Sequence, residues 1–430
     1  MSWPGRVGDV MSVVPDVRSV ELDSLLQRLA KLSIRGLAEM YDSRAYSFPR
    51  TLRSRSGRFP PVAEGMSVRY TAIAALGLSR LDARTRRDVL AGRDVVDLLP
   101  GILGLALAGR DPGALALAAW AATEVRAATT TRAVTDERGR TARAVDRLLA
   151  NVRTEAPIPT VDHAWTLVAL AAAAGTEALT ELTAGEEELE EATERAAEQL
   201  LTAQGSTGLF PHHLPPSRLS RLRYHVGCFA DQVYAIQALA RYGAATGNER
   251  ALTAAGRCAD RLVALQGDQG QWWWHYDWRH GTVVERYPVY SVHQHAMAPM
   301  ALMELREAGG PDHRAAIVKG LAWLLDRPES AADLIADELG VVWRKVGRRE
   351  TRKIVRKVRS AASSSQPEVR MAWLDRVFPP GAVDRECRPY ELGWLLYAWQ
   401  ADRPLETVDA PSSPQVFTLA PTAQTTGDPE

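Results

Sequence analysis

Residues 264–301 hold an unusual share of the side chains that can bind or transform a small molecule. The central part, QWWWHYDWRHGTVVERYPVYSVHQH (271–295), carries four of the chain's twelve tryptophans and four of its nine histidines. Aromatic rings stack on the apolar faces of ligands, and histidine exchanges protons near neutral pH. We therefore expect this segment to face a small-molecule substrate.

Four side chains are the expected acid/base groups: Asp162, Asp231, His293 and His295. Both aspartates lie in the first turn of an otherwise apolar helical segment, where burial and the helix dipole can shift a carboxyl pKa. The two histidines are two residues apart, so on a helix they point roughly 200° apart and cannot both face one cavity. Metal-binding histidine pairs on helices are four residues apart, so we expect neither a metal ion nor a cofactor.

The expected substrate-binding side chains are polar or aromatic and lie in the tryptophan-rich loop or at helix starts. They are Trp273, Trp274, His275, Tyr276, Tyr287, Tyr290, Gln232, Gln294 and Glu391. In an extended loop, alternate side chains face opposite ways, so only about half of residues 272–277 can line a pocket. His212 and His213, flanked by prolines, are interpreted as loop surface or a lid.

Helical periodicity dominates the chain, strand signals are nearly absent, and two kinds of helical segment alternate. One kind is apolar on nearly all sides, as in a buried helix, and covers residues 66–81, 112–128, 160–175, 229–243, 290–308 and 388–400. The other kind carries a charged surface face and covers residues 83–108 in broken form, 135–153, 184–204, 248–266 and 312–327. This alternation predicts an all-α fold, an α/α toroid of six hairpins. A solenoid of helical hairpins is disfavoured because the period is irregular.

The connections that lead from a surface helix to the next buried helix include the long ones, residues 205–228, 267–289 and 328–387. In such a barrel all connections of one kind lie at the same end, so the aromatic loops should surround the mouth of the inner ring. Polar side chains in the first turns of the buried helices should then converge on one cavity, where long loops on a rigid scaffold usually carry function.

A single toroid domain is expected over residues 17–403, between disordered tails at 1–16 and 404–430. A basic amphipathic helix, expected over residues 344–359, offers peripheral contact with a membrane surface. Zero net charge argues against nucleic-acid binding. Three distant cysteines, and the lack of a signal peptide or membrane span, favour the cytoplasm, with the inner face of the membrane as a peripheral option.

Two copies of one motif lie 62 residues apart, each at the end of a surface helix. Residues 200–210 (LLTAQGSTGLF) and 262–272 (LVALQGDQGQW) both read Leu-x3-Gln-x3-Gly-x-aromatic. The motif resembles the QW repeat of the terpenoid cyclase and protein prenyltransferase superfamily, seen in squalene-hopene cyclase, whose fold is an α/α toroid. The resemblance implies that Gln204 and Gln266 tie helix ends to their neighbours, that glycine permits the turn, and that Phe210 and Trp272 close the seam by stacking.

The same resemblance implies a terpenoid cyclase-like enzyme, an isomerase or lyase that acts by general acid/base chemistry on an isoprenoid in an aromatic-lined cavity. In TVDHAW (160–165), Asp162 falls on the proton-donating position of the family's DxDD motif, while Thr160 and His163 replace the flanking acids. The chain has no convincing DDxxD motif for diphosphate, and it lacks the Asp-x-Cys pair of the zinc-binding prenyltransferases.

Six-hairpin toroids also host carbohydrate-active enzymes, which gives an alternative from a second class. Sugar sites combine stacking tryptophans with Asp, His, Tyr and Arg, as residues 272–295 do. The alternative is therefore a glycoside hydrolase, polysaccharide lyase or sugar epimerase, in which Asp231 pairs with Asp277, Glu285 or Glu391. A third option is a non-catalytic toroid that binds a lipid or a glycan.

Overall fold

The computed structural model describes residues 17–54, 61–129, 135–154, 156–183, 185–216, 223–349, 354–364, 366 and 371–399. The tails expected at 1–16 and 404–430 lie outside the described residues. None of the helices in the described ranges combines the length and the apolar character that crossing a bilayer requires.

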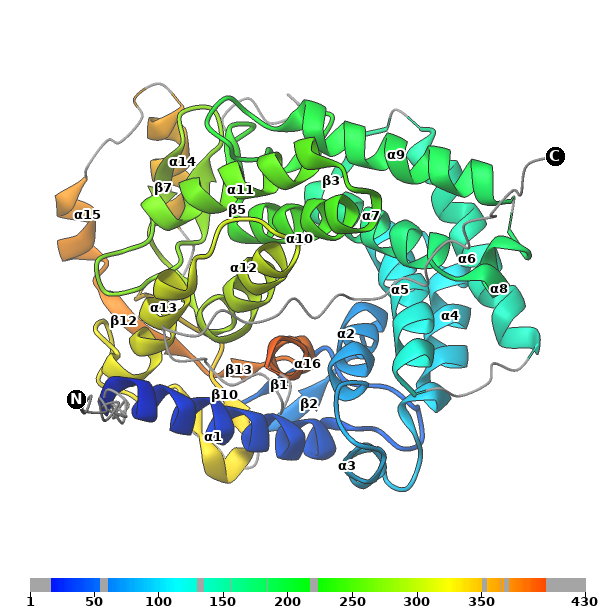
Figure 1. Ribbon diagram of the computed structural model, residues 1–430. Coiled ribbons are helices and arrows are strands. Elements are labelled where there is room, and N and C mark those ends of the chain that lie inside the picture. The colour runs from blue at the N-terminus through cyan, green and yellow to red at the C-terminus, as the bar shows by residue number, and fades with distance from the viewer. Residues whose placement is uncertain are drawn as a thin grey trace, which may run out of the picture.

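Buried helices stand around one axis, as Figure 1 shows. Within the described residues these inner helices are α2 (Val68–Leu78), α5 (Pro112–Thr129), α7 (Thr160–Ala174), α10 (Phe229–Thr246), a π-helical turn with α12 (His293–Met297 and Ala298–Glu307) and α16 (Pro389–Ala398). Each inner helix packs against the next one along the chain, and α16 packs against α2. The ring is therefore closed, and the prediction of an α/α toroid is confirmed.

The first and last inner helices meet through glycine. A Cβ on Gly77 of α2 would lie 2.2 Å from the carbonyl oxygen of Gly393 in α16, and a Cβ on Gly393 would lie 2.8 Å from that of Ile73. Any larger side chain at these positions would push the two backbones apart. The closure of the ring thus depends on two residues that lack a side chain.

The outer helices cover the inner ring and bury one face each. They are α1 (Val17–Met40), α4 (Leu99–Ala108), α6 (Thr135–Val152), α9 (Glu186–Ala203), α11 (Glu249–Ala264) and α13 (Arg314–Asp326), with the short α3 (Ala83–Val89) and α8 (Glu177–Thr180) between them. The sequence prediction did not include α1, which packs against α16, α13 and α3 and completes the outer layer. Its buried Leu22, Leu25, Leu26 and Leu29 follow helical spacing, so the signal was present in the sequence.

The two Leu-x3-Gln-x3-Gly-x-aromatic motifs join neighbouring outer helices as expected. The Nε2 group of Gln204 donates hydrogen bonds to the carbonyl oxygens of Gly208 and of Ala254 in α11, both at 2.8 Å. The Nε2 group of Gln266 donates likewise to Gly270 (3.1 Å) and to Ala316 in α13 (2.9 Å). Each glutamine therefore ties the end of its own helix to the next outer helix.

The motif glycines are required by both conformation and space. Gly270 has φ of +94°, and a Cβ there would lie 1.9 Å from the carbonyl oxygen of Lys319 in α13. Gly247, which ends α10, also has positive φ (+70°), but no heavy atom lies within 4 Å of its Cβ position. A comparison of alanine substitutions at the two glycines therefore distinguishes the free-energy cost of the left-handed backbone from that of the steric clash.

We expect Gly270→Ala to lower the free energy of unfolding by more than about 2 kcal/mol, because conformational strain and a backbone clash add. Gly247→Ala, the matched control, should cost about 1 kcal/mol from strain alone. Urea unfolding followed by circular dichroism measures both. Equal losses for the two variants would contradict the close packing of residues 266–272 on α13.

Short antiparallel strands surround one end of the ring, although strand signals were nearly absent from the sequence. Three sheets have three strands each. In the first, β1 (Thr51–Arg53) pairs with β2 (Val62–Glu64) and β13 (Glu386–Cys387); in the second, β6 (His275–Asp277) pairs with β5 (Val226–Cys228) and β7 (Thr282–Glu285); in the third, β11 (Lys345–Arg348) pairs with β8 (Val289–Tyr290) and β12 (Pro380–Asp384). Two further pairs are β3 (Ile158–Pro159) with β4 (His213–Leu214) and β9 (Ile335–Ala336) with β10 (Val341–Val342). Strands β3, β5, β8 and β13 each end just before an inner helix. The long connections therefore gather around the mouth, the end where the inner helices begin.

The opposite end of the inner ring is filled by a buried ion cluster. Arg241 of α10 lies 2.7 Å from a carboxylate oxygen of Glu304 in α12 and 3.2 Å from one of Glu124 in α5. Glu124 also pairs with Arg80, just after α2, and accepts a hydrogen bond at 2.6 Å from Tyr397 of α16. Although burial alone raises it, the guanidinium groups of Arg241 and Arg80 bring the pKa of Glu124 down to about 2. Two cations, two anions and one tyrosine thus join five inner helices.

Candidate functional site at the mouth of the toroid

The third residue of several inner helices is polar and faces the mouth region. Asp162, Asp231 and Glu391 are each third in α7, α10 and α16, and His293 lies 62 residues after Asp231, the same offset as between the two motifs. All four side chains are at least 97% buried. The inner helices thus place four titratable side chains near their first turns at the mouth. Each of these side chains has a different partner.

Asp162 is held by an arginine from the neighbouring inner helix. Its carboxylate accepts hydrogen bonds from Nη1 and Nη2 of Arg69 at 2.6 and 2.9 Å, while Arg69 Nε donates to Asp111 at 2.8 Å. A Cβ on Gly113 would lie 2.3 Å from Asp162, so this glycine makes room for the pair. Burial raises the pKa of Asp162 in spite of the guanidinium. A carboxylate with a raised pKa is a better base than an ordinary aspartate.

Asp231 is fully buried and forms a dyad with His212. The Nδ1 group of His212 donates to the two carboxylate oxygens at 3.0 and 3.2 Å, and the backbone N–H of Cys228 donates to Oδ2 at 2.6 Å. The His212 side chain is 49% exposed, so the ring can meet a ligand that Asp231 cannot reach. The hydrogen bond to Asp231 and its negative charge raise the pKa of His212.

The sequence pattern points to Asp231 as a site residue but not to its partner His212. His212 lies 19 positions earlier, just before β4, and was interpreted as loop surface or a lid. The antiparallel pairing of β4 with β3 brings this loop to the start of α7, and the backbone N–H of Thr160 donates to the carbonyl oxygen of His212 at 3.0 Å. That contact depends on strand register, which a sequence pattern does not report.

Cys228 adds a thiol to this dyad. The ligand atoms of His212, Cys228 and Asp231 all lie within 4.8 Å of one another, and imidazole, thiolate and carboxylate are a donor set that zinc accepts. Burial and then the charge of Asp231 raise the pKa of the Cys228 thiol well above its ordinary value. Hydrogen bonds already satisfy Asp231, so they account for the cluster and we assign it no metal.

Aromatic rings surround His293 near the start of its inner helix. The ring of His293 stacks on Phe229 with centroids 4.2 Å apart and on Trp274 at 5.5 Å, and Tyr290 packs on Trp274 at 4.7 Å. Burial lowers the pKa of His293 to about 3. His293 is therefore a neutral ring at physiological pH, and its surroundings suit stacking better than the acid/base role that was expected.

Two arginines that lack an ion-pair partner within the described residues act on His275. The side chain of His275 is 96% buried, and its Nδ1 has no hydrogen-bond partner in the described structure. Burial, followed by the positive charges of Arg356, Arg223 and His212, lowers the pKa of His275 well below its ordinary value. Neither Arg223 nor Arg356 forms an ion pair with any residue that the structure describes. An anionic ligand would supply the missing charge.

Gln232 and Gln294 are framework residues rather than the substrate-binding residues that were expected. Gln232 Oε1 accepts the backbone N–H of Phe210 at 2.7 Å, and Gln294 Oε1 accepts that of Trp272 at 3.3 Å. The Nε2 group of Gln232 donates to Phe210 and that of Gln294 to Tyr290, both to carbonyl oxygens. The two glutamines thus anchor the aromatic residue of each motif to the following inner helix.

Three further expected site residues lie in the protein interior. The ring of Tyr276 is fully buried, and His295 is fully buried with its pKa lowered to about 3 by burial. Glu391 is fully buried as well, accepts the backbone N–H of Arg388 at 3.1 Å and pairs with Arg344 at 3.2 Å. We assign none of the three a contact with substrate.

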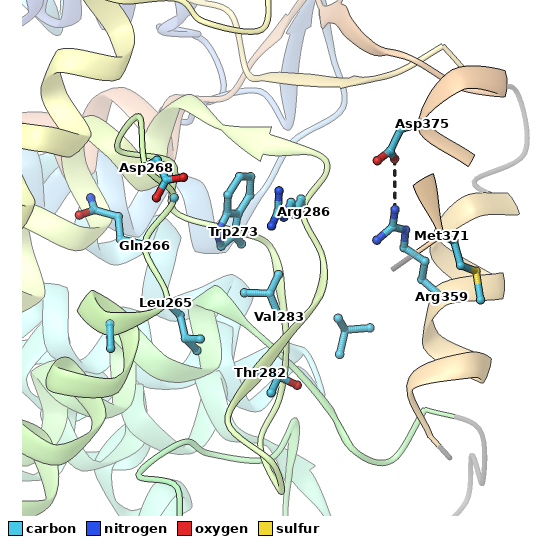
Figure 2. A pocket seen from close by; sticks show the side chains of 13 residues that line it. Leu265, Gln266, Asp268, Trp273, Thr282, Val283, Arg286, Arg359, Met371 and Asp375 are labelled. Carbon is cyan, nitrogen blue, oxygen red and sulfur yellow. Dashed lines mark hydrogen bonds and ion pairs between the residues drawn. The ribbon is translucent and has the colours of Figure 1, made fainter. Parts of the chain in front are cut away.

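Trp273 and Tyr287 lie beside a different cavity from the dyad. Their rings meet edge to face at 6.2 Å, and the guanidinium of Arg286 lies 5.4 Å from the ring of Trp273. Figure 2 shows Trp273 and Arg286 lining a cavity of about 550 Å³ between the β6–β7 hairpin and the helices α14 (Ile354–Ser363) and α15 (Ala372–Val377). A second cavity, of about 690 Å³, lies between α6 and α9 and is bordered by His163. The side chains of Asp162, His212 and Asp231 line neither cavity.

The other carboxylates considered as partners of Asp231 are already paired. Asp277 binds Arg279 at 3.1 Å and His280 at 3.0 Å. Glu285 binds Arg348 at 3.0 Å and Arg359 at 2.9 Å. Both carboxylates hold the hairpin and the helices beside it in place.

The basic helix expected over residues 344–359 is wrong in its extent. Residues 345–348 form strand β11, and helix α14 begins only at Ile354, while residues 350–353 lie outside the described part of the chain. Three of the basic residues, Arg344, Arg348 and Arg359, turn inward and pair with Glu391 and Glu285. Much of the positive charge in this segment is therefore structural.

Comparison with known proteins adds information on the fold. No family model and no curated protein matches this sequence. Among solved structures, an unsaturated glucuronyl hydrolase specific for heparin has a TM-score of 0.57 at 11% identity, over 88% of this chain and 95% of its own. The enzyme of the same name from Streptococcus agalactiae has a TM-score of 0.56 at 9% identity, over 92% and 96%. That from Bacillus sp. GL1 has a TM-score of 0.53 at 12% identity, over 88% and 100%.

These similarities show the fold alone, an α/α toroid like that of the unsaturated glucuronyl hydrolases. The assignment to the terpenoid cyclase and prenyltransferase superfamily is therefore wrong. The predicted cyclase function, with its isomerase and lyase chemistry, is wrong as well. The Gln-x3-Gly-x-aromatic motif keeps its structural role in this chain. It joins outer helices of a toroid and does not identify the chemistry inside.

Proposed function

We propose that the protein is an enzyme that hydrolyses a glycosidic bond next to an acidic sugar at the mouth of the toroid. The observation that carries this proposal is the dyad of buried Asp231 with half-exposed His212, at the same level as a second carboxylate, Asp162. The similar solved structures are glucuronyl hydrolases, which supports the same class for this chain.

The dyad and Asp162 have complementary tasks in this proposal. Because Nδ1 of His212 is bonded to Asp231, the protonated ring presents its Nε2–H to the exposed side. His212 gives this proton to the leaving oxygen as the glycosidic C–O bond breaks. Asp162 accepts a proton from the attacking water, whose hydroxyl bonds to the anomeric carbon. Asp231 positions His212 through the hydrogen bond to Nδ1.

The acidic character of the substrate follows from Arg223 and Arg356. These two cations act on His275 without a paired carboxylate in the described structure, so a uronate carboxylate would neutralise them. Trp274 and Tyr290 offer ring faces for stacking against the sugar.

Incubation with unsaturated glucuronyl disaccharides and with matched nitrophenyl glucuronides and glucosides tests the proposal. We expect acidic substrates to release a new reducing end or nitrophenol, and neutral ones to react more slowly. Arg223→Gln should raise KM for acidic substrates and change KM for neutral ones little. Absence of turnover for every glycoside would overturn the proposal.

The protonation of His212 can be measured without a substrate. Its pKa should lie above the ordinary 6.5 in the native protein and should fall in Asp231→Asn, which removes the stabilising charge. Because the folded-state pKa is raised, this pair stabilises the fold fully below pH 6.5 and loses that effect as pH rises through the raised value. Histidine NMR titration, with His212→Asn to identify the resonance, gives both values. A native midpoint at or below 6.5 would contradict the dyad.

A further inference from the structure

Helices α14 and α15 carry a concentration of exposed apolar side chains. Nine large hydrophobic side chains are exposed in the described part of the chain, and four of them lie on these two short helices: Ile354 (43%), Val358 (36%), Trp373 (58%) and Val377 (59%). Each helix contributes a pair at i and i+4, which lies on one helical face. The remaining five are scattered over the rest of the molecule.

An adjacent face of each helix, about 100° around the helix axis from the exposed pair, attaches it to the protein. Val355 of α14 and Leu374 of α15 are almost fully buried, and Arg359 pairs with Asp375 at 3.1 Å between the helices, as Figure 2 shows. Figure 1 places the helices side by side at the periphery, outside the inner ring. The four exposed apolar residues therefore face solvent at the periphery of the toroid.

The charges beside these apolar residues are positive. Lys357 of α14 and Arg376 of α15 are exposed and form no ion pair within the described ranges. The neighbouring Asp375 is already neutralised by Arg348 at 2.8 Å and by Arg359. The outward surface thus combines tryptophan, valine and isoleucine with free cations.

We propose that α14 and α15 bind the surface of a membrane that contains anionic lipids, with Trp373 and Val377 inserted at the interface and Lys357 and Arg376 against the headgroups. Tryptophan and branched apolar side chains partition into the interfacial region, and each nearby cation adds attraction to an anionic leaflet. This inference is independent of the glycan chemistry at the mouth.

A bilayer suits this surface better than a protein partner. A stable protein interface covers about 800 Å² on each partner, formed by some 20 to 30 residues. The two helices together contain sixteen residues, and only one face of each is exposed. A few inserted side chains and a small positive charge are instead enough for reversible contact with lipids.

Sedimentation of the full chain with lipid vesicles tests the proposal. Vesicles of phosphatidylcholine alone are compared with vesicles in which a third of the lipid is phosphatidylglycerol, at low and at high salt. We expect binding to the anionic vesicles, weakened by salt, and roughly tenfold weaker binding for Trp373→Ser/Val377→Ser and for Lys357→Glu/Arg376→Glu. Leu105→Ser, which removes a 48% exposed leucine from α4, is the matched control and should bind normally.

Two results would overturn the proposal. One is equal sedimentation with neutral and anionic vesicles, or binding that the two double variants leave intact. The other is an oligomer of the native chain, seen by light scattering, that Trp373→Ser/Val377→Ser converts to a monomer, because the surface would then bind a second copy.

Discussion

Replacing Asp231 by asparagine should reduce kcat/KM on an acidic glycoside by roughly a hundredfold to ten-thousandfold, the range of a lost general acid. Without the negative charge of Asp231, His212 loses its proton near neutral pH and cannot protonate the leaving oxygen. The loss should fall on kcat, because Asp231 is fully buried and touches no substrate. Asparagine can still accept the backbone N–H of Cys228 through Oδ1, so the start of α10 is preserved.

A positioning role has a signature that a structural role lacks. If Asp231 acts by keeping His212 protonated, the residual activity of Asp231→Asn should recover as pH falls and the ring gains its proton from solution. Asp82→Asn is the matched control, because Asp82 accepts the backbone N–H groups of Arg84 and Thr85 at the start of α3, away from the mouth. A pH profile of unchanged shape, or a lowered thermal midpoint that accounts for the loss, would remove Asp231 from the proposed mechanism.

The architecture could be predicted because each helix shows, in its own apolar and charged residues, whether it is buried or exposed. A helix that is apolar on all sides can only be buried, so the alternation of such helices with charged ones identifies an inner and an outer ring. The strands could not be found in this way. Each has two to five residues, too few to show alternation, and they form because the long connections meet at the mouth.

The sequence points to only part of the proposed site, and the residues it misplaces have a common cause. Asp162 and Asp231 are candidates because a carboxylate in an apolar helix is conspicuous. Gln232 lies in the same turn but bonds the backbone of Phe210, which lies 22 residues earlier in the preceding loop. His212 reaches Asp231 from that same loop. Such contacts depend on how loops lie across helix ends, and no residue spacing reports them.

The Leu-x3-Gln-x3-Gly-x-aromatic motif shows which properties a resemblance to a known family can predict. Gln204 and Gln266 bond the backbone of the next outer helix, and Gly270 lets the turn approach α13, so the motif solves a packing problem of any toroid. Its residues point into the seam between helices and not into the mouth. The motif predicted the architecture correctly and the chemistry wrongly for the same physical reason.

The largest effect on stability is expected at the closed end of the inner ring. Arg241→Met should lower the free energy of unfolding by about 3–5 kcal/mol, because it leaves Glu304 and Glu124 buried with too little positive charge. The distances of 2.7 and 3.2 Å, with a further bond from Gln237 to Glu304 at 3.1 Å, show that the side chains are held in one geometry. Urea unfolding followed by circular dichroism gives the change.

The free energy of unfolding that Arg241→Met loses should depend on the balance of buried charges and not on the lost contacts alone. Arg241→Met/Glu304→Leu removes one cation and one anion and leaves the Arg80–Glu124 pair, so it should recover a large part of the stability that Arg241→Met loses. Glu124 gives a second check through its pKa of about 2, against 4.5 ordinarily. Since this pKa is lowered, its contribution is complete above pH 4.5 and disappears as pH falls toward 2.

The exposed pair of Arg250 and Glu198 supplies the matched control for the ion cluster. Their side chains are 71% and 42% exposed at a separation of 2.9 Å, so water screens the charges that Arg250→Met would unbalance. We expect that variant to cost less than about 1 kcal/mol. If Arg241→Met proves as mild as Arg250→Met, water must reach the cluster, and the closed end of the toroid would then be held by the tryptophan and tyrosine rings packed around Arg241 rather than by its charges.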